Sequence, residues 1–401
     1  MTDRLFPRRY LRFDWIRSAA GNLPSIVLLA RAANRSIHHE LPAALRERGL
    51  TEPETRWSDA RPPLASLYSD LPSGTTIPTY PYSPTLSEPL SACPDLRIPN
   101  PVLSAADVTD YGRVEYVADP FLFVSEDEGY HLFFEVYNGD RRPDAVIGHA
   151  TSPDGGRHWR YDRVVLEADS HLSFPYVFEW DGTHYMLPEQ GGASGESVVL
   201  YAAREFPTDW SERAVLISAN HPVNDTVLFR WKERWWALVG GSTAGDRTYA
   251  YFSDDLTTEG WSPHRENPIV TDRPAAARPG GRPIVRDNRI IAFFQDCVIN
   301  YGEKVRGYEI TELTPSTYVD RELARSPLLR PVNRAIGWNA GRMHHIDPWY
   351  TGDGWLCAVD GDVGPRPNPV AKPYWSIGMY VSPDPKVDDS LDSASGRDRI
   401  G

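Results

Sequence analysis

Short apolar runs alternate with turn residues along residues 115–382. The runs are rich in β-branched and aromatic residues, and Asp and Gly lie between them, as in Trp180-Asp181-Gly182 and Gly352-Asp353-Gly354. Runs of this composition are typical of half-buried strands, and Asp-Gly turns are typical of tight hairpins. The pattern therefore predicts an all-β domain built from antiparallel strands.

Five of the runs open alike and divide this region into repeats. The openings are Ala118–Phe123, Ser173–Phe178, Asn224–Phe229, Ala277–Gly281 and His345–Tyr350. Taken as equivalent positions, Asp119, Pro175, Asp225, Arg278 and Asp347 are separated by steps of 56, 50, 53 and 69 residues. Steps near 50 residues are the size of a propeller blade. A second run follows each opening after a turn, and third and fourth runs follow in several repeats. Four strands in each repeat predict a five-bladed β-propeller over residues 101–382.

A turn motif between the third and fourth runs of the first repeat supports this fold. Residues 152–159, Ser-Pro-Asp-Gly-Gly-Arg-His-Trp, match the S-x-D-x-G-x-x-W pattern of the Asp-box in sialidase-type propellers. There the Asp accepts backbone N–H bonds and the Trp packs beneath the turn. The chain shows no obvious set of three spaced arginines for a sialic carboxylate, so the motif favours the fold and not sialidase activity.

Three further segments flank the repeats. Residues 1–50 have apolar positions at helical spacing and predict an N-terminal helical segment, residues 51–100 predict a Pro-rich linker, and residues 383–401 predict a disordered acidic tail. The N-terminal segment is rich in Arg. Two placements stay open for it: packing on the propeller, or weak contact with an anionic membrane surface.

The composition narrows the class of function. A net charge of −13 and the lack of a basic patch in residues 100–380 argue against nucleic-acid binding. Three cysteines without C-x-x-C spacing indicate neither a disulfide framework nor a zinc site, and we expect no metal and no cofactor. The expected location is the cytoplasm, with peripheral membrane contact through the Arg-rich N-terminus as a further option.

The repeat openings also predict where polar chemistry gathers. The first strand of each blade lines the axis of a propeller, so residues at one end of the five openings converge. This brings together Asp119, Asp225, Arg278, His345 and Asp347, and the ends of the second strands add Glu135, Glu189, Asp296 and Asp360. Two carboxylates across a sugar ring suffice for glycoside hydrolysis. The alternative is that these acids only tie the blades together.

Several segments in the same order resemble known carbohydrate-active propellers. The Asp119-Pro120 opening is similar to the start of the arabinanase, xylosidase and invertase-type five-bladed propellers. Residues 100–380 resemble more closely the N-terminal domain family of plant glucosamine inositolphosphorylceramide transferase. The matching segments are Ala118–Leu122, His171–Pro175, Tyr185–Glu189, Trp235-Trp236, Ala277–Gly281, Phe294–Cys297, Tyr301-Gly302 and Val359–Gly361.

The resemblance implies a glycosidase-like propeller in which Asp119 is the base or nucleophile. We assign Glu189 as the acid, and Asp225 and Asp347 as the carboxylates that adjust its pKa. The substrate-binding candidates are Arg278, His345, Glu135, Asp296 and Trp338. Two departures matter: Pro175 stands where many furanosidases carry a carboxylate, and the transferase catalytic domain has no counterpart, so we expect no transferase activity from this chain alone.

Three functional hypotheses follow from the sequence. The first is a glycoside hydrolase-like enzyme that acts on cell-surface or lipid-linked glycan, with a carbohydrate or glycolipid as substrate. The second is a non-catalytic glycan-binding propeller that supports a glycosyltransferase partner. The third is a scaffold propeller whose acids are all structural. A catalytic pair requires two carboxylates that face one open pocket, whereas a binding module requires only aromatic and amide groups around a rim.

Overall fold

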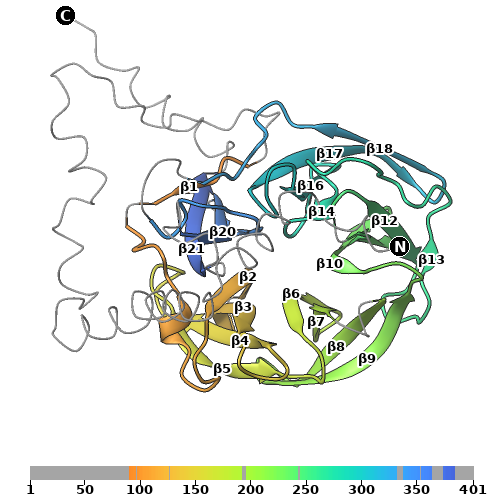
Figure 1. Ribbon diagram of the computed structural model, residues 1–401. Coiled ribbons are helices and arrows are strands. Elements are labelled where there is room, and N and C mark those ends of the chain that lie inside the picture. Colours follow the sequence, from red (N-terminus) through yellow and green to blue (C-terminus); the bar gives the residue numbers. More distant parts are fainter. Residues whose placement is uncertain are drawn as a thin grey trace, which may run out of the picture. The chain divides into compact units, whose positions relative to one another are not determined.

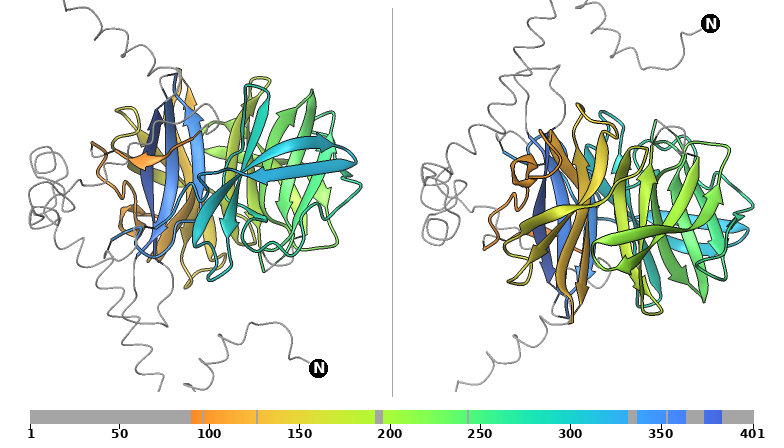
Figure 2. Two further views of the ribbon diagram at one scale, coloured as in Figure 1. Left: turned by 90° about the horizontal axis from the view of Figure 1, so that it is seen from above. Right: turned by 90° about the horizontal axis from the view of Figure 1, so that it is seen from below.

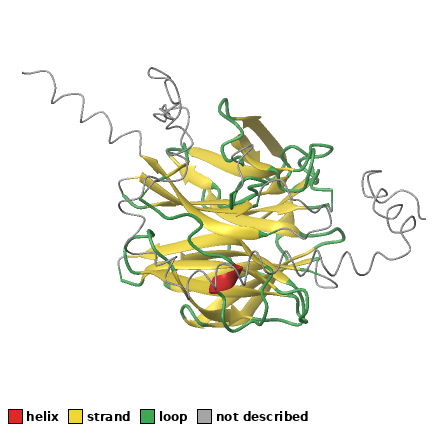
Figure 3. Ribbon diagram, turned by 60° about the vertical axis from the view of Figure 1, so that its left-hand side comes forward, coloured by secondary structure: helices red, strands yellow, loops and turns green. Residues whose placement is uncertain are grey.

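The computed structural model is an all-β propeller of five sheets around a central axis (Figure 1). It describes residues 90–95, 97–125, 127–191, 196–242, 244–331, 337–352, 354–363 and 374–383. The predicted helical segment, most of the predicted linker and the predicted acidic tail lie outside these residues. Among the described residues the one helical element is a 3-10 turn, η2 (Ala105–Asp107), so none of their helices is long and apolar enough to cross a membrane (Figure 3).

Each blade is an antiparallel sheet whose strands follow one another from the axis outward. Blade one holds β2 (Tyr116–Ser125), β3 (Gly129–Tyr137), β4 (Ala145–Ser152) and β5 (Arg160–Leu166), and blade two holds β6 (Leu172–Trp180), β7 (Thr183–Gln190), β8 (Ser197–Glu205) and β9 (Asp209–Ser218). Blade three holds β10 (Asn224–Trp231), β11 (Arg234–Gly240), β12 (Thr248–Ser253) and β13 (Ser262–Pro263). Blade four holds β14 (Arg278–Pro279), β15 (Ile284–Arg286), β16 (Arg289–Asp296), β17 (Lys304–Thr314) and β18 (Thr317–Glu322). The predicted five-bladed fold is confirmed.

Blade five is completed by a strand from the start of the described chain. It holds β19 (Ile346–Tyr350), β20 (Gly354–Asp362) and β21 (Trp375–Pro383), and its outermost strand is β1 (Cys93–Pro94), which pairs with β21. The Ser91 amide also donates to the Ser382 hydroxyl (2.8 Å). The sequence placed residues 90–100 in a linker, because a two-residue strand leaves too short an apolar pattern to recognise.

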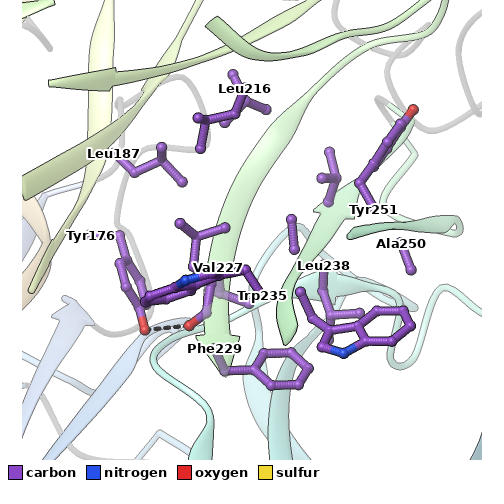
Figure 4. Packing of buried hydrophobic residues seen from close by; sticks show 14 of the residues in the cluster. Tyr176, Leu187, Leu216, Val227, Phe229, Trp235, Leu238, Ala250 and Tyr251 are labelled. Carbon is purple, nitrogen blue, oxygen red and sulfur yellow. Dashed lines mark hydrogen bonds between the residues drawn. The ribbon is translucent and has the colours of Figure 1, made fainter. Parts of the chain in front are cut away.

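Apolar side chains fill the space between neighbouring blades. The labelled residues of Figure 4 come from blades two and three, and Tyr176, Val227 and Trp235 meet where the two sheets face each other. The Tyr176 hydroxyl donates to the Leu228 carbonyl (2.6 Å), which satisfies the polar end of a buried ring. The inner strands β2 and β6 are buried on both faces, which explains the near-continuous apolar runs of the sequence. Figure 2 shows the sheets of the propeller from two further sides.

The Asp-box forms the predicted turn between β4 and β5. Asp154 accepts from the His158 amide (2.9 Å), and the Ser152 hydroxyl accepts from the Gly156 amide (2.8 Å). The buried Trp159 ring donates to the Gly156 carbonyl (3.0 Å). The motif thus fastens the outer strand of blade one and takes no part in the axial site.

A buried ion pair ties four blades together on the axis. Arg282 of blade four donates through Nε to Asp347 Oδ1 of blade five (2.7 Å) and through Nη2 to the carbonyls of Leu122 (3.1 Å) and Val177 (2.8 Å) in blades one and two. The Leu122 amide donates in turn to Asp347 Oδ2 (2.6 Å). The preceding Gly281 allows this approach, because a Cβ there would lie 1.7 Å from the Ile346 carbonyl oxygen.

This ion pair gives a stability prediction. We expect Arg282→Met to lower the free energy of unfolding by about 3–5 kcal/mol, because it leaves Asp347 buried without its cation. Urea unfolding at neutral pH measures the change. The matched control is Arg234→Met, which breaks the exposed Arg234–Asp254 pair (2.7 Å) and is expected to cost less than about 1 kcal/mol. Equal losses in the two variants would contradict a special role for the axial pair.

Candidate functional site

The inner strands of three blades break their register at the same place. The ladder shifts between Ala118 and Phe121 in β2, between Ser173 and Tyr176 in β6, and between Asn224 and Val227 in β10. At each break one residue has positive φ: Asp119 (51°), Phe174 (47°) and Asp225 (43°). A bulge re-aims a side chain, and positive φ in a non-glycine residue is costly, so such positions gather at functional sites.

The bulges correct one equivalence assumed from the sequence. Phe174, and not Pro175, occupies the position of Asp119 and Asp225 in blade two. The assumed equivalence of Asp119 with Pro175 is one residue out, because the dipeptides Asp119-Pro120 and Phe174-Pro175 occupy matching positions. Blade two therefore contributes an aromatic ring at this level of the axis, and its carboxylate comes from the next strand.

Two glutamates occupy matching positions on the second strands. Glu135 pairs with Ala118 across β2 and β3, and Glu189 pairs with Ser173 across β6 and β7.

In blade four the residue opposite Arg278 is Gln295, not Asp296. Because successive side chains of a strand point to opposite faces, Asp296 turns away and pairs with Arg306 (2.8 Å) and Lys304 (3.7 Å). The prediction that Asp296 lies with the axial acids is therefore wrong, and the preceding residue, Gln295, occupies that place.

Arg278 joins two of the acids. Its Nε donates to Asp225 Oδ2, and its Nη2 lies 3.3 Å from Glu189 Oε2. Glu189 Oε2 also accepts from the Asp225 amide (2.7 Å), and Gln295 donates to Asp225 Oδ2 (2.6 Å). Burial opposes ionisation of Asp225, but Arg278 outweighs it and holds the pKa of Asp225 below its usual value. Burial and the Asp225 charge raise the pKa of Glu189 well above its usual value.

A second group forms around His344. Its Nδ1 lies 2.6 Å from Asp360 Oδ2, and its Nε2 lies 3.7 Å from Asp119 Oδ1. Asp360 Oδ1 also accepts from the His344 amide (3.0 Å). Burial opposes the charge on both partners, but their mutual attraction outweighs it, so the pKa of Asp360 is lowered and that of His344 is raised. Burial raises the pKa of Asp119 to about 7; His344 opposes this, while Asp225 and Asp360 add to it.

The same three residues have the composition of a metal site. Asp119, His344 and Asp360 each offer a ligand atom, and these atoms lie within 4.8 Å of one another. Carboxylate and imidazole ligands suit several divalent cations. A protonated His344 between two carboxylates accounts for the same arrangement, so the geometry fits an ion-paired histidine as well as a metal ligand set.

The edge of the site carries Glu135 and two aromatic residues. Glu135 accepts from the Tyr116 hydroxyl (3.2 Å) and lies 3.5 Å from His171 Nε2. Burial, and then the Asp119 charge, raise the pKa of Glu135 well above its usual value. Tyr301 places its ring 5.1 Å from the Arg278 guanidinium and 5.4 Å from the His344 ring. The Tyr301 ring thus supplies an aromatic surface at the edge of the site, of the kind that packs against a sugar face.

Two predicted site residues lie elsewhere, and a third, His345, adjoins the acids. Asp347 is held by Arg282 deeper along the axis, where it binds the Leu122 amide, and it does not join Asp119. His345 Nδ1 lies 3.9 Å from Asp119 Oδ1, and the His345 amide donates to Asp360 Oδ1 (3.1 Å). The His345 ring is fully buried against the rings of Phe121 (4.6 Å) and Phe174 (5.2 Å), and burial lowers its pKa to about 4. Trp338 packs on blade five, where a Cβ at Gly361 would lie 2.7 Å from its ring.

The structure adds His344, Gln295, Tyr301 and His171 to the site. The sequence contained a partial signal for all four. His344 directly precedes the fifth opening, and His171, Gln295 and Tyr301 lie in segments that resemble the transferase family. Neighbouring residues of a strand point to opposite faces, and this decides whether His344 or His345, and whether Gln295 or Asp296, points toward the acids. The choice depends on the positions of bulges and strand starts, which the apolar pattern does not reveal.

Five blades with acids gathered around one end of the axis define a glycosidase-like five-bladed propeller. The fold is similar to the catalytic domain of Coprinopsis cinerea GH62 α-L-arabinofuranosidase (TM-score 0.54, 12% identity, 68% of this chain and 93% of that chain). It is also similar to β-1,2-mannobiose phosphorylase from Listeria innocua (TM-score 0.52, 14% identity, 73% of this chain and 98% of that chain). At these identities the likeness shows the fold alone.

Sequence similarity identifies the family. The chain belongs to the family described as "Glucosamine inositolphosphorylceramide transferase 1, N-terminal", which matches residues 86–362. The transferase of that name from Oryza sativa subsp. japonica is 34% identical over 282 residues, which cover 66% of this chain and 36% of the relative. The Arabidopsis thaliana transferase is 33% identical over 274 residues, 66% of this chain and 35% of the relative. The chain thus spans about a third of the length of these relatives.

The raised pKa of Asp119 predicts how stability depends on pH. A carboxyl that keeps its proton in the folded state stabilises the protein at low pH, and this contribution is lost as pH rises from about 4 through about 7. Because Asn cannot ionise, we expect Asp119→Asn to exceed the wild type in stability above pH 7, by about 1–4 kcal/mol, and by less near pH 5. Urea unfolding across this range measures the difference. A difference that does not vary with pH would contradict the assignment, and the exposed Asp209→Asn serves as control.

Proposed function

We propose that this propeller carries out glycosidase-type acid–base chemistry on the glycan headgroup of a lipid-linked substrate. The substrate class comes from the plant relatives, whose name contains glucosamine and inositolphosphorylceramide, and from the glycosidase-like fold. Asp119 is the base and Glu189 is the acid. Asp225 and Asp360 stay ionised beside them and keep their pKa values raised.

One observation supports this division of roles above the others. Asp225 and Asp360 are closed to solvent, with side-chain exposures of 2% and 0%, and each is held by a cation, Arg278 or His344. Glu189 and Asp119 retain exposures of 13% and 9%, and both have raised pKa values. Glu189 and Asp119 are therefore the acids that both reach solvent and can hold a proton, as the acid and the base of a glycosidase must.

The chemical step follows from these protonation states. Protonated Glu189 gives its proton to the glycosidic oxygen as the bond to the anomeric carbon breaks. Ionised Asp119 accepts a proton from the water whose oxygen bonds to that carbon, so the products are a free sugar and the alcohol of the headgroup. Arg278 and Tyr301 border the space in which the sugar is held.

A specific contact favours a second candidate, a glycan-binding propeller without turnover. Glu189 Oε2 already accepts from the Asp225 amide (2.7 Å) and faces Arg278 (3.3 Å). A carboxylate held in this way can act as a fixed part of the site that orients Arg278. In that case the propeller binds the glycan and presents it to a glycosyltransferase partner.

Turnover of a defined compound separates the two candidates. With glucosamine-inositol phosphate as the soluble probe, we expect Asp119→Asn to lower kcat by about a hundredfold or more, because the amide cannot accept a proton. Binding of the probe, measured by calorimetry, should change less than about threefold. Glu189→Gln is expected to lose turnover likewise, with a smaller loss on a probe whose leaving group needs no protonation.

The pH profile provides the control on mechanism. If Asp119 is the base, kcat/KM of the wild type rises with pH through about 7, because the ionised form is required. Asp209 is an exposed acid of β9, and the control variant Asp209→Asn should leave kcat and KM unchanged. Tight binding of the probe by the wild type without turnover at any pH would favour the binding propeller over the enzyme.

A further inference from the structure

The loop between β16 and β17 exposes two neighbouring aliphatic side chains. Val298 is 59% exposed and Ile299 is 62% exposed, the largest values among the exposed large apolar residues of the described chain, and Tyr301 adds 38%. The others are single residues scattered over different blades: Trp180, Val215, Val285, Val319 and Tyr350. Single exposed apolar residues are ordinary, whereas a contiguous group indicates a contact surface.

Backbone and side-chain hydrogen bonds hold this loop away from the core. The Cys297 amide donates to the Pro274 carbonyl (2.8 Å), the Val298 amide to Asp296 Oδ1 (3.1 Å), and the Glu303 amide to the Asp296 carbonyl (2.9 Å). Arg342 donates to the Tyr301 carbonyl (3.3 Å). Both ends of the loop are thus fixed, and the two aliphatic side chains stay at its tip. Asp296 therefore has a structural role that accounts for its burial beside the site.

The loop borders the acid-lined site. Tyr301 follows the aliphatic pair by two residues, and its ring lies beside Arg278 and His344, which hold the acids. A ligand that fills the site therefore passes close to the loop. A free sugar has no hydrocarbon chain to place on Val298 and Ile299, whereas a sugar on a lipid headgroup brings a hydrocarbon interface with it.

We propose that the loop of residues 297–302 inserts Val298 and Ile299 into the surface of a lipid bilayer and thereby presents the site to a lipid-linked glycan. This inference rests on the proposed glycolipid substrate and adds the element that reaches the membrane. Exposed Arg141, Arg142 and Arg247 lie on loops between second and third strands, at the same end of the propeller, where they can face lipid phosphates. Asp140 and Asp246 lie on the same loops, so apolar contact is the main contribution.

The small size of the tip favours a bilayer over a protein partner. A stable protein interface buries about 1,200–2,000 Å² in total with a well-packed apolar centre. Two aliphatic side chains between charged loops fall far below this requirement. Insertion of a few apolar side chains below the lipid headgroups needs no complementary surface, because each buried CH₂ contributes separately.

Vesicle binding of the full chain tests the proposal. We expect the wild type to sediment with vesicles of phosphatidylcholine and phosphatidylinositol at high salt, where charge contacts of arginines, including any made by the Arg-rich N-terminal sequence, are screened. The double variant Val298→Asn with Ile299→Asn should bind about tenfold more weakly, with an unchanged melting temperature. The conservative double variant Val298→Leu with Ile299→Leu should bind as the wild type does.

Val319→Asn is the matched control, because Val319 is 44% exposed on β18, the outermost strand of the same blade. It should leave vesicle binding unchanged. Wild-type protein that does not bind the vesicles, or equal loss in Val319→Asn and the double variant, would overturn the proposal. A change of oligomeric state in the double variant without a change in vesicle binding would also overturn it and would assign the loop to a protein contact.

The outcome is separable from that of the proposed function. If both proposals hold, the double variant turns over soluble glucosamine-inositol phosphate normally and loses turnover only on the vesicle-bound glycolipid. Loop-dependent vesicle binding without turnover of either substrate supports the membrane contact and counts against the enzyme. Equal turnover of the vesicle-bound glycolipid by the wild type and the double variant counts against the membrane contact and leaves the enzyme in place.

Discussion

The buried pair of Arg282 and Asp347 is the interaction on which the arrangement of this propeller depends. A ring of sheets must fill its axis, and inner strands that twist apart leave backbone groups of several blades facing one another there. One guanidinium satisfies carbonyls of blades one and two while its charge is balanced from blade five. Asp347 also accepts a hydrogen bond from the Leu122 amide of blade one. The polar groups at the centre are thus matched, and the acids at the axial end are free for another role.

That end of the axis concentrates more negative charge than its cations can neutralise. Asp119, Glu135, Glu189, Asp225 and Asp360 face Arg278 and His344. The result is a division of pKa values: those of Asp225 and Asp360, which lie closest to a cation, are lowered, and those of Glu135 and Glu189 are raised. The same site therefore holds a neutral acid, Glu189, and an ionisable base, Asp119. The division arises from position, since all five groups are of the same chemical type.

The fold could be predicted from the sequence because the same pattern of apolar runs and turns recurs in each blade. Five similar openings and alternating turns establish the blades, and strand order within a blade follows from chain order. The details of the site follow less directly, because they depend on which face of a strand a residue occupies. Phe174 and Pro175, Gln295 and Asp296, and His344 and His345 are adjacent alternatives, and bulges with positive φ decide among them. Asp119, Glu189, Asp225 and Arg278 were predicted together because each aligned with a repeat.

The pairing of β1 with β21 affects how this ring can be joined to other domains. Cys93 lies opposite Val381, so the chain enters and leaves the propeller on neighbouring strands at the outer edge of one blade. Further sequence can therefore be added before the first strand or after the last one without disrupting the strand pairing of the other four blades. Both additions would start from the same point on the rim. Any domain attached to this ring at either end is therefore tethered at blade five, a fixed position relative to the acid-lined end of the axis.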